Sequence, residues 1–181
     1  LLISILAGAD EAALAARFDA QAIVRAMRNL PVEIGKGVVA LHSDGADAEA
    51  RAATEALMAP LGLVEWVEAS QFAVVGALAG SGPAFVYRFV DALAAGGAAL
   101  GLPAEQALRL ALATAEGGAL LAAGSADSPG VLADRVASPG GSTRAGLNVL
   151  DADDALKQLV TETLTASVRR DAEMAEAARA G

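Results

Sequence analysis

The hexapeptide Ser138-Pro139-Gly140-Gly141-Ser142-Thr143 separates two short segments with helical character, residues 131–137 and 144–150. Proline fixes φ before the turn, and the glycines open backbone angles that other residues avoid. Ser142 or Thr143 is suited to cap the following helix. Such a loop points unpaired N–H groups and the positive end of a helix dipole at one place. The stretch therefore predicts either an anion site for a carboxylate or phosphate, or a capped turn without a ligand.

The composition predicts slim helices that approach one another closely. The 181 residues suffice for one domain with a sizeable core or for two small ones. Apolar residues make up 55% of the chain and aromatic residues only 3%, so small side chains such as alanine supply much of the apolar share. The formal charge of −9 argues against a nucleic-acid partner.

The sequence offers few groups for side-chain catalysis. It contains no cysteine, which excludes disulfides and thiolate chemistry. His42 is the single histidine, lies at the end of an expected strand and is predicted to be a surface residue. No ligand cluster with metal-binding spacing surrounds it in the sequence, so no metal site is predicted. The carboxylates are scattered and are interpreted as solvated charge.

The apolar stretches do not predict a membrane protein. Residues 1–8 are apolar but have no basic leader, which indicates an interior strand rather than a secretory signal. Arg88 and Asp91 interrupt one later stretch, and Arg109 and Glu116 another, before the roughly 20 apolar residues that a membrane helix needs. We therefore expect a cytoplasmic protein without a membrane partner.

The front of the chain, residues 1–69, has an α/β pattern. Short apolar runs bounded by turn residues are typical of buried strands, and the last run alternates as an edge strand does. Strands are expected at residues 2–6, 22–27, 37–41 and 63–68, and helices at residues 10–18 and 46–61. This alternation favours a sheet covered by helices.

Residues 70–181 have an all-helical pattern. Helices are expected at residues 71–79, 83–100, 104–123, 131–137, 144–150 and 154–179. The run Gly80-Ser81-Gly82-Pro83 is expected to break the first two apart, since proline is well tolerated in a first helical turn. The helix at residues 104–123 is apolar nearly all round, so we expect a partner chain to cover part of it.

Three motifs in this order resemble pyrroline-5-carboxylate reductase: Ala79-Gly80-Ser81-Gly82-Pro83-Ala84-Phe85, Gly101-Leu102-Pro103, and Val136-Ala137-Ser138-Pro139-Gly140-Gly141-Ser142-Thr143. Residues 3–8 and 24–31 also look like the family's later Rossmann strands. The resemblance covers the whole chain. It implies a fold of α/β plus all-α class, with the C-terminal part of a Rossmann domain at residues 1–69 followed by a helical dimerisation domain at residues 70–181.

The resemblance also implies an activity. The family reduces 1-pyrroline-5-carboxylate to L-proline with hydride from NADPH or NADH, the last step of proline biosynthesis. The substrate carboxylate is implied to lie on N–H groups of the loop that contains Ser138, Gly140, Gly141, Ser142 and Thr143. Thr143 is implied to lie beside the ring nitrogen as the catalytic residue, where its hydroxyl orients the imine.

The cofactor contacts implied by the resemblance are Ala7, Gly8, Asn29 and Pro83, with the first two bordering the nicotinamide at the carboxyl end of a strand. The family usually has proline where Arg28 stands and threonine where Leu30 stands. No Gly-x-Gly-x-x-Gly follows a strand in this chain. We therefore expect a sequence that represents the C-terminal two-thirds of such an enzyme and binds dinucleotide weakly or not at all.

The resemblance further implies a homodimer built by residues 83–179, and larger rings of dimers are compatible with it. Two other readings stay open. One is a non-catalytic helical dimerisation module left by truncation of such an enzyme. The other is a dehydrogenase of hydroxy acids, a class that commonly uses lysine or histidine; Lys36 and Lys157, which are expected in a turn and on a solvated helix face, disfavour it.

Overall fold

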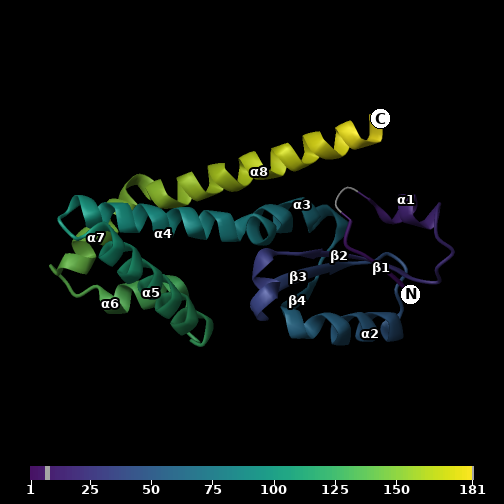
Figure 1. Ribbon diagram of the computed structural model, residues 1–181, viewed down its shortest axis with the longest axis horizontal. Coiled ribbons are helices and arrows are strands. Elements are labelled where there is room, and N and C mark those ends of the chain that lie inside the picture. The colour runs from purple at the N-terminus through teal and green to yellow at the C-terminus, as the bar shows by residue number, and fades with distance from the viewer. Residues whose placement is uncertain (7–8, 181) are drawn as a thin grey trace. The chain divides into compact units, whose positions relative to one another are not determined.

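The computed structural model describes residues 1–6 and 9–180 and divides into two compact units (Figure 1). The sheet unit comprises Leu1–Pro83 and Thr163–Gly181, and the helical unit comprises Ala84–Glu162. This division does not coincide with the domain boundary predicted at residue 69, because residues 69–83 belong to the compact unit that contains the sheet. The boundary between domains stays a prediction.

The sheet contains four strands in the order β1-β2-β3-β4, with bounds Leu2–Ser4, Ile23–Arg28, Gly37–His42 and Gly62–Trp66. Strands β1 and β2 are parallel, β2 and β3 are antiparallel, and β3 and β4 are parallel. The prediction of four strands with the last one at an edge is confirmed. Helix α1, Glu11–Ala15, is shorter than expected, and α2 spans Ala48–Met58.

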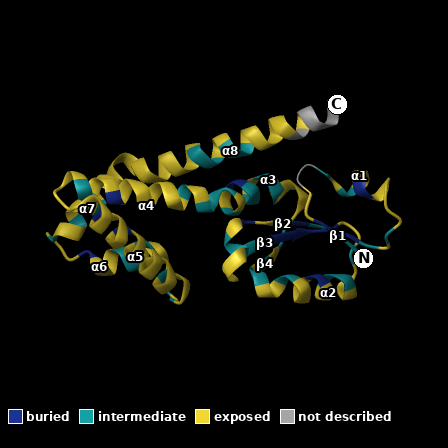
Figure 2. Cartoon of the chain, in the orientation of Figure 1, coloured by how far each residue is buried: buried dark blue, intermediate teal, exposed yellow. Residues whose placement is uncertain are grey.

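The core of the sheet unit lies between the sheet and α2. Val24, Val39 and Leu41 on the central strands are fully buried, and so is Thr54 of α2. Residues two apart on a strand share one face, which is why Val39 and Leu41 enter the same cluster. Thr54 lies in this apolar setting because its hydroxyl donates to the Ala50 carbonyl at 2.7 Å. Figure 2 shows buried residues gathered on the strands.

Two glycines begin β3 and β4 side by side. Gly37 and Gly62 are register partners, and Gly62 has a φ of +134°. A Cβ atom on Gly62 would lie 2.1 Å from the Gly37 carbonyl oxygen, and one on Gly37 would lie 2.3 Å from Val32 Cγ1. Only glycine fits at either position, so this pair fixes where the two strands start.

One nearly continuous helical stretch follows the sheet. It consists of α3 (Phe72–Val75), the π-helical turn Gly76–Gly80 and α4 (Gly82–Ala99). The break predicted at Gly80–Pro83 is narrower than expected: one helical element ends at Gly80 and the next begins at Gly82, and Ser81 between them keeps φ −84° and ψ −20°. Pro83 has no N–H group for the Ala79 carbonyl four residues earlier, and this carbonyl instead accepts from Asn29 Nδ2 at 3.0 Å.

The π-helical turn packs against β2, where a Cβ atom on Gly76 would lie 3.5 Å from the Met27 sulfur. The helical stretch Ala69–Ala99 is long and apolar enough to cross a membrane, judged by length and composition alone. Of its most apolar 18-residue segment, 11% is buried. A single stretch that passes this test is weak evidence for a membrane span. The expected absence of a membrane partner therefore stays a prediction.

The helical unit is built from α4 onward. Helices α5 (Ala104–Ala123), α6 (Pro129–Val136) and α7 (Ser142–Asp151) follow, and α8 (Ala155–Ala180) begins in this unit. Gly101, with a φ of +109°, supplies the left-handed residue after α4. Val90, Ala94 and Ala111 form the buried cluster, and most other positions on these helices are exposed (Figure 2).

Candidate functional site

The predicted substrate loop forms a tight turn between α6 and α7. The Gly141 N–H group donates to the Ser138 carbonyl at 3.0 Å and closes the turn. Gly141 is the N-cap of α7, with an extended backbone at φ −78° and ψ 165°. The prediction that Ser142 or Thr143 caps this helix is wrong, because both already lie in its first turn.

The start of α7 has the geometry of an anion site. No side chain caps this helix, and its first three N–H groups belong to Ser142, Thr143 and Arg144. The first four N–H groups of a helix lack an intrahelical partner, and the helix dipole makes this end positive. Ser142 and Thr143 are exposed. A carboxylate can therefore reach these groups from solvent, with the Thr143 hydroxyl on the same helical turn.

The two glycines of the loop serve different purposes. Gly140 has a φ of +70°, a left-handed conformation that side chains disfavour, and a Cβ atom there would meet nothing within 4 Å. Gly141 has an ordinary φ, but its Cβ atom would lie 2.6 Å from Ser138 Oγ and 3.2 Å from the Ser138 carbonyl oxygen. Backbone angle selects glycine at the first position, and close approach selects it at the second.

An ion pair holds the two helices around the loop. Arg144 Nη2 at the start of α7 lies 2.6 Å from Asp134 Oδ1 on α6. A second pair joins Arg135 of α6 to Asp127 in the preceding loop. The Arg144 guanidinium group next to the anion site is therefore already paired. The backbone N–H groups at the start of α7 are the main donors for a carboxylate.

Asn29, one of the predicted cofactor contacts, has a structural role in the sheet unit. It is buried, and its Nδ2 donates to the Ala79 carbonyl at 3.0 Å while its Oδ1 accepts from the Val38 N–H group at 2.8 Å. Its side chain thus ties the end of β2 to β3 and to the π-helical turn. Cofactor contact by Asn29 stays a prediction.

Of the other predicted cofactor positions, Pro83 is half-buried in the first turn of α4. Ala7 and Gly8 lie outside the described residues. The two positions that depart from the family, Arg28 and Leu30, are both exposed beside Asn29. The role of these residues toward a cofactor therefore rests on the sequence.

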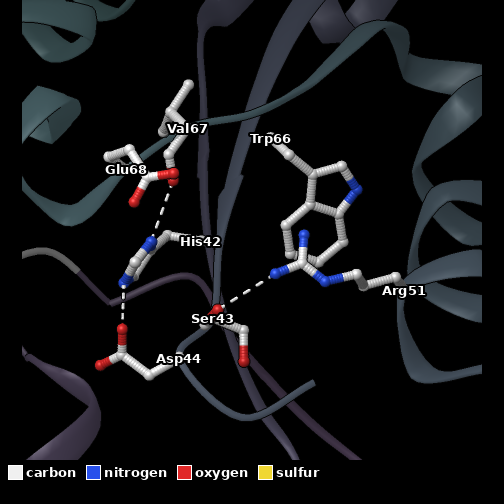
Figure 3. Close-up of a pocket in the computed structure, with 7 residues that line it drawn as sticks. All are labelled: His42, Ser43, Asp44, Arg51, Trp66, Val67 and Glu68. Carbon is white, nitrogen blue, oxygen red and sulfur yellow. Dashed lines mark hydrogen bonds and ion pairs between the residues drawn. The ribbon is translucent and has the colours of Figure 1, made fainter. Parts of the chain in front are cut away.

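The structure also contains a pocket that the sequence did not indicate (Figure 3). It measures about 270 Å³ and lies in the sheet unit, not at the predicted substrate loop. Its lining residues come from the end of β3, from α2 and from the end of β4: His42, Ser43, Asp44, Arg51, Trp66, Val67 and Glu68.

The prediction of His42 as a surface residue is wrong, because only 6% of it is exposed. Strand β3 runs one residue further than expected and includes His42. The Phe72 ring of α3 covers it edge-on, with ring centroids 5.9 Å apart. Glu11 and Asp44 lie on the other side of the imidazole. Local sequence could not show this, because Glu11 and Phe72 are both far away along the chain.

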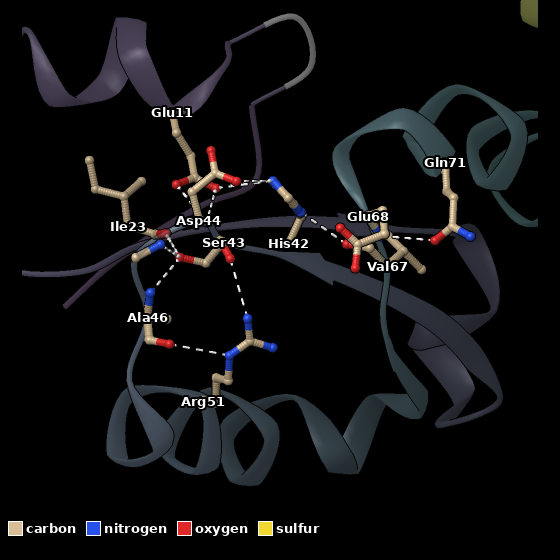
Figure 4. A network of polar contacts seen from close by, with 11 residues as sticks. Glu11, Ile23, His42, Ser43, Asp44, Ala46, Arg51, Val67, Glu68 and Gln71 are labelled. Atoms are coloured by element: carbon tan, nitrogen blue, oxygen red, sulfur yellow. Dashed lines mark hydrogen bonds and ion pairs between the residues drawn. The ribbon is translucent and has the colours of Figure 1, made fainter.

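A network of polar contacts fixes the wall of this pocket (Figure 4). The Ser43 hydroxyl donates to the Ile23 carbonyl at 2.6 Å and accepts from the Ala46 N–H group at 3.0 Å. Arg51 Nη2 donates to the Ser43 carbonyl at 3.3 Å, and its guanidinium carbon lies 4.2 Å from the centre of the Trp66 ring. The turn after β3 is therefore held by contacts with β2 and with α2.

Comparison with known proteins finds relatives over most of the chain. The family model "Pyrroline-5-carboxylate reductase dimerisation" matches residues 69–174, and so includes the loop before α7. The pyrroline-5-carboxylate reductase of Synechocystis is 36% identical over 175 residues, which are 96% of this chain and 65% of that protein. The one of Thermus thermophilus is 38% identical over 177 residues, 96% of this chain and 66% of that protein.

Solved structures show the same fold. The structure of a pyrroline-5-carboxylate reductase from Coxiella burnetii has a TM-score of 0.89 at 33% identity and covers 94% of this chain and 64% of that one. Plasmodium falciparum pyrroline carboxylate reductase with NADP bound has a TM-score of 0.83 at 27% identity, over 97% and 71%. The present chain spans slightly less than two thirds of the length of the Synechocystis and Thermus thermophilus proteins. Because the family model matches more than half of the 181 residues, the chain belongs to the pyrroline-5-carboxylate reductase family.

Proposed function

We propose that this chain supplies the substrate-binding part of an NAD(P)H-dependent pyrroline-5-carboxylate reductase, which reduces 1-pyrroline-5-carboxylate to L-proline. The observation that carries the proposal is the uncapped start of α7 behind the Ser138–Gly141 turn. Membership in the family and the proteins named above support it.

The loop binds and orients the substrate in this proposal. The substrate carboxylate accepts hydrogen bonds from the N–H groups of Ser142 and Thr143, which hold it without a paired cation. The Thr143 hydroxyl meets the ring nitrogen and orients the C=N bond. NADPH or NADH, when bound, supplies the hydride that adds to the imine carbon. The nitrogen gains a proton, so its charge and hydrogen bonding change along the reaction.

The described residues fit part of such a cofactor. Pro83 presents an apolar ring, which suits a wall against a flat nicotinamide, and Asn29 holds the end of β2 in place through its two backbone contacts. These two contacts use the Asn29 oxygen and one of its two amide N–H groups, so a second N–H group is left for a cofactor. A glycine fingerprint for the pyrophosphate is absent from the printed sequence.

We also propose that the protein is a homodimer joined through residues 83–179. Large apolar side chains of the helical unit are exposed in the single chain, including Phe89, Leu112, Leu120 and Leu121. The description of the family model as a dimerisation region agrees with a second copy as their cover. The larger ring of dimers and the cytoplasmic location stay predictions from the sequence.

Kinetics on Thr143 variants test the proposed function in the protein that contains this chain. Thr143→Ala should lower kcat about 10- to 100-fold, roughly 1.4–2.8 kcal/mol, with a smaller change in KM, because the contact at nitrogen strengthens in the transition state. Thr143→Ser keeps the hydroxyl and should retain most of the turnover. If Thr143→Ala kept the wild-type kcat and KM, the substrate nitrogen would be met elsewhere.

Gly141→Val tests carboxylate binding separately from the role of the Thr143 hydroxyl in turnover. Its side chain would enter the space of Ser138 Oγ and of the approaching carboxylate. We expect a steep rise in KM for the imine, or loss of binding of a proline-like inhibitor. A KM equal to that of the wild type would show that the carboxylate does not lie on this loop.

The structure does not support the alternative hypothesis of a hydroxy-acid dehydrogenase, because neither lysine lies in a buried site. Lys36 is exposed, and Lys157 is fully exposed on α8. A hydrogen bond of 2.9 Å from Lys157 to Asp154 raises the pKa of the lysine above its usual value, which keeps it charged. Neither lysine has the buried setting that a proton-transfer role requires.

A further inference from the structure

We propose that Glu11, His42 and Asp44 form a binding site for a divalent transition-metal ion of the zinc or cobalt type. The three side chains come from the start of α1, the end of β3 and the turn after it, and they converge beside the pocket (Figure 4). Their candidate ligand atoms all lie within 4.8 Å of one another. The site does not depend on the proposed reductase function.

The hydrogen bonding of His42 prepares one ring nitrogen as a ligand. Its Nδ1 lies 2.9 Å from the Val67 carbonyl oxygen. Because a carbonyl only accepts, Nδ1 carries the proton, and Nε2 in the neutral ring has a free lone pair. This lone pair faces the carboxylates of Glu11 and Asp44. Three electron-rich atoms turned toward one point repel each other unless a metal ion or a proton on Nε2 lies between them, and a backbone carbonyl on the other ring nitrogen is the usual support of a metal-binding histidine.

The distances agree with a metal rather than with direct hydrogen bonds. His42 Nε2 is 3.4 Å from Asp44 Oδ1 and 3.5 Å from Glu11 Oε1. A charge-assisted hydrogen bond from a protonated ring would be about 2.7–2.9 Å long. Zinc bonds of about 2.0–2.1 Å in tetrahedral geometry place neighbouring ligand atoms about 3.3–3.4 Å apart. The two distances from His42 Nε2 match this spacing, and the three ligand atoms together lie within 4.8 Å of one another.

Each ligand is held by its own element. Asp10 caps α1 by accepting from the Ala13 N–H group at 2.8 Å, which fixes the helix turn that carries Glu11. Both oxygens of Glu11 lie 3.1 Å from the Asp44 N–H group, so its carboxylate is oriented before any ion arrives. His42 is buried against Phe72. The Asp44 side chain is 80% exposed, so it has the freedom to adjust around an ion.

The donor set selects the class of ion. One imidazole and two carboxylates suit zinc, cobalt and related transition metals, whereas magnesium and calcium prefer oxygen ligands throughout. The two carboxylates neutralise a divalent ion. Three protein ligands leave a fourth position on the exposed side of Asp44, which a water molecule fills.

Titration with Co²⁺ and Zn²⁺ tests the site in the intact chain by calorimetry and, for cobalt, by visible absorption. We expect one ion per chain, a four-coordinate cobalt spectrum, and a melting temperature that rises with metal concentration. Glu11→Gln and Asp44→Asn should each weaken binding at least about tenfold. Glu49→Gln removes the same charge from an exposed position on α2 outside the cluster and should leave the affinity unchanged.

The two ligand variants are chosen to keep the fold. Asp44 is exposed, and glutamine at position 11 still accepts from the Asp44 N–H group, so both variants should melt like the wild type without metal. Absence of saturable binding in the wild type would overturn the proposal, and so would equal affinity in the ligand variants and in Glu49→Gln. Reductase activity is not a readout, so failure of the proposed function leaves this test intact.

Discussion

The sheet unit and the helical unit bury different kinds of side chain. In the sheet unit, the branched residues Val24, Val39 and Leu41 are fully buried. In the helical unit, most buried residues are alanines, such as Ala94, Ala107 and Ala111, and many large apolar side chains are exposed. Close helix packing on alanine faces turns the leucines outward. The sheet unit therefore has a core of branched side chains, although it too exposes large apolar groups such as Ile34 and Leu57, and the helical unit leaves most of its largest apolar groups for another surface.

The difference matters for how each unit is stabilised. Fully burying a leucine side chain contributes roughly 1.5–3 kcal/mol. Leu108, Leu110 and Leu112 of α5 are each about half exposed, with values of 46–53%. A second copy of the chain that covers them would supply the missing stabilisation. The stability of the helical unit should therefore depend on protein concentration, and that of the sheet core should not.

A matched pair of truncations tests this contrast most directly. Leu41→Ala should lower the free energy of unfolding by about 2–5 kcal/mol at any protein concentration, because it opens a cavity in a closed core. Leu112→Ala should act mainly through association, with an effect on the free energy of unfolding that grows as the protein is concentrated, because the lost dimer contacts count only where the wild type is dimeric. Denaturant unfolding at two concentrations measures both. A concentration-dependent loss in Leu41→Ala would contradict the separation of the two units.

Charges on the outer face of α5 should break the dimer. Leu108 and Leu112 are one helical turn apart and both exposed in the single chain. Replacing both by lysine should raise the dimer dissociation constant at least about 100-fold, about 2.8 kcal/mol. Sedimentation equilibrium measures the shift, and Gln106→Lys is a control that adds a lysine to another face of the same helix. A dimer as tight as the wild type in the double variant would place the interface on other helices.

Helix caps give the smallest expected difference between the units. Asp47 caps α2 in the sheet unit with a hydrogen bond of 2.8 Å to the Ala50 N–H group, and Ser128 caps α6 in the helical unit at 3.3 Å to the Val131 N–H group. Asp47→Ala should lower the free energy of unfolding by about 1 kcal/mol. Ser128→Ala should lower it by less, because the hydrogen bond of Ser128 is longer. Thermal unfolding of the two variants measures both losses. A larger loss in Ser128→Ala than in Asp47→Ala would show that the surroundings of a cap matter more than its hydrogen-bond length.

Much of the fold follows from local sequence signals. Pro103 and Gly124 bracket α5, and the predicted bounds of that helix agree with Ala104–Ala123. The strands were recognisable because each short apolar run ends at turn residues. The break predicted at Gly80–Pro83 is present only at Ser81, and the sequence does not show that Met27 lies beneath a widened turn just before it.

The candidate sites divide in the same way. The loop before α7 was predictable, because proline and glycines at a helix start have a local physical meaning, although the cap residue proved to be Gly141. The cluster around His42 was not predictable. The cluster depends on the register of β3 and on the position of α1, which is far away in the sequence. Neither residue spacing nor composition indicates these two features.

The glycine pair at the start of β3 and β4 has a consequence for evolution and for protein engineering. Selection on Gly37 and Gly62 acts through backbone space alone, because neither position has a side chain to offer to a ligand. A library of random codons at Gly62 should return almost only glycine, even under selection for folding without activity. Invariance at these two positions among relatives would then record how tightly two strands are joined, and would say nothing about chemistry.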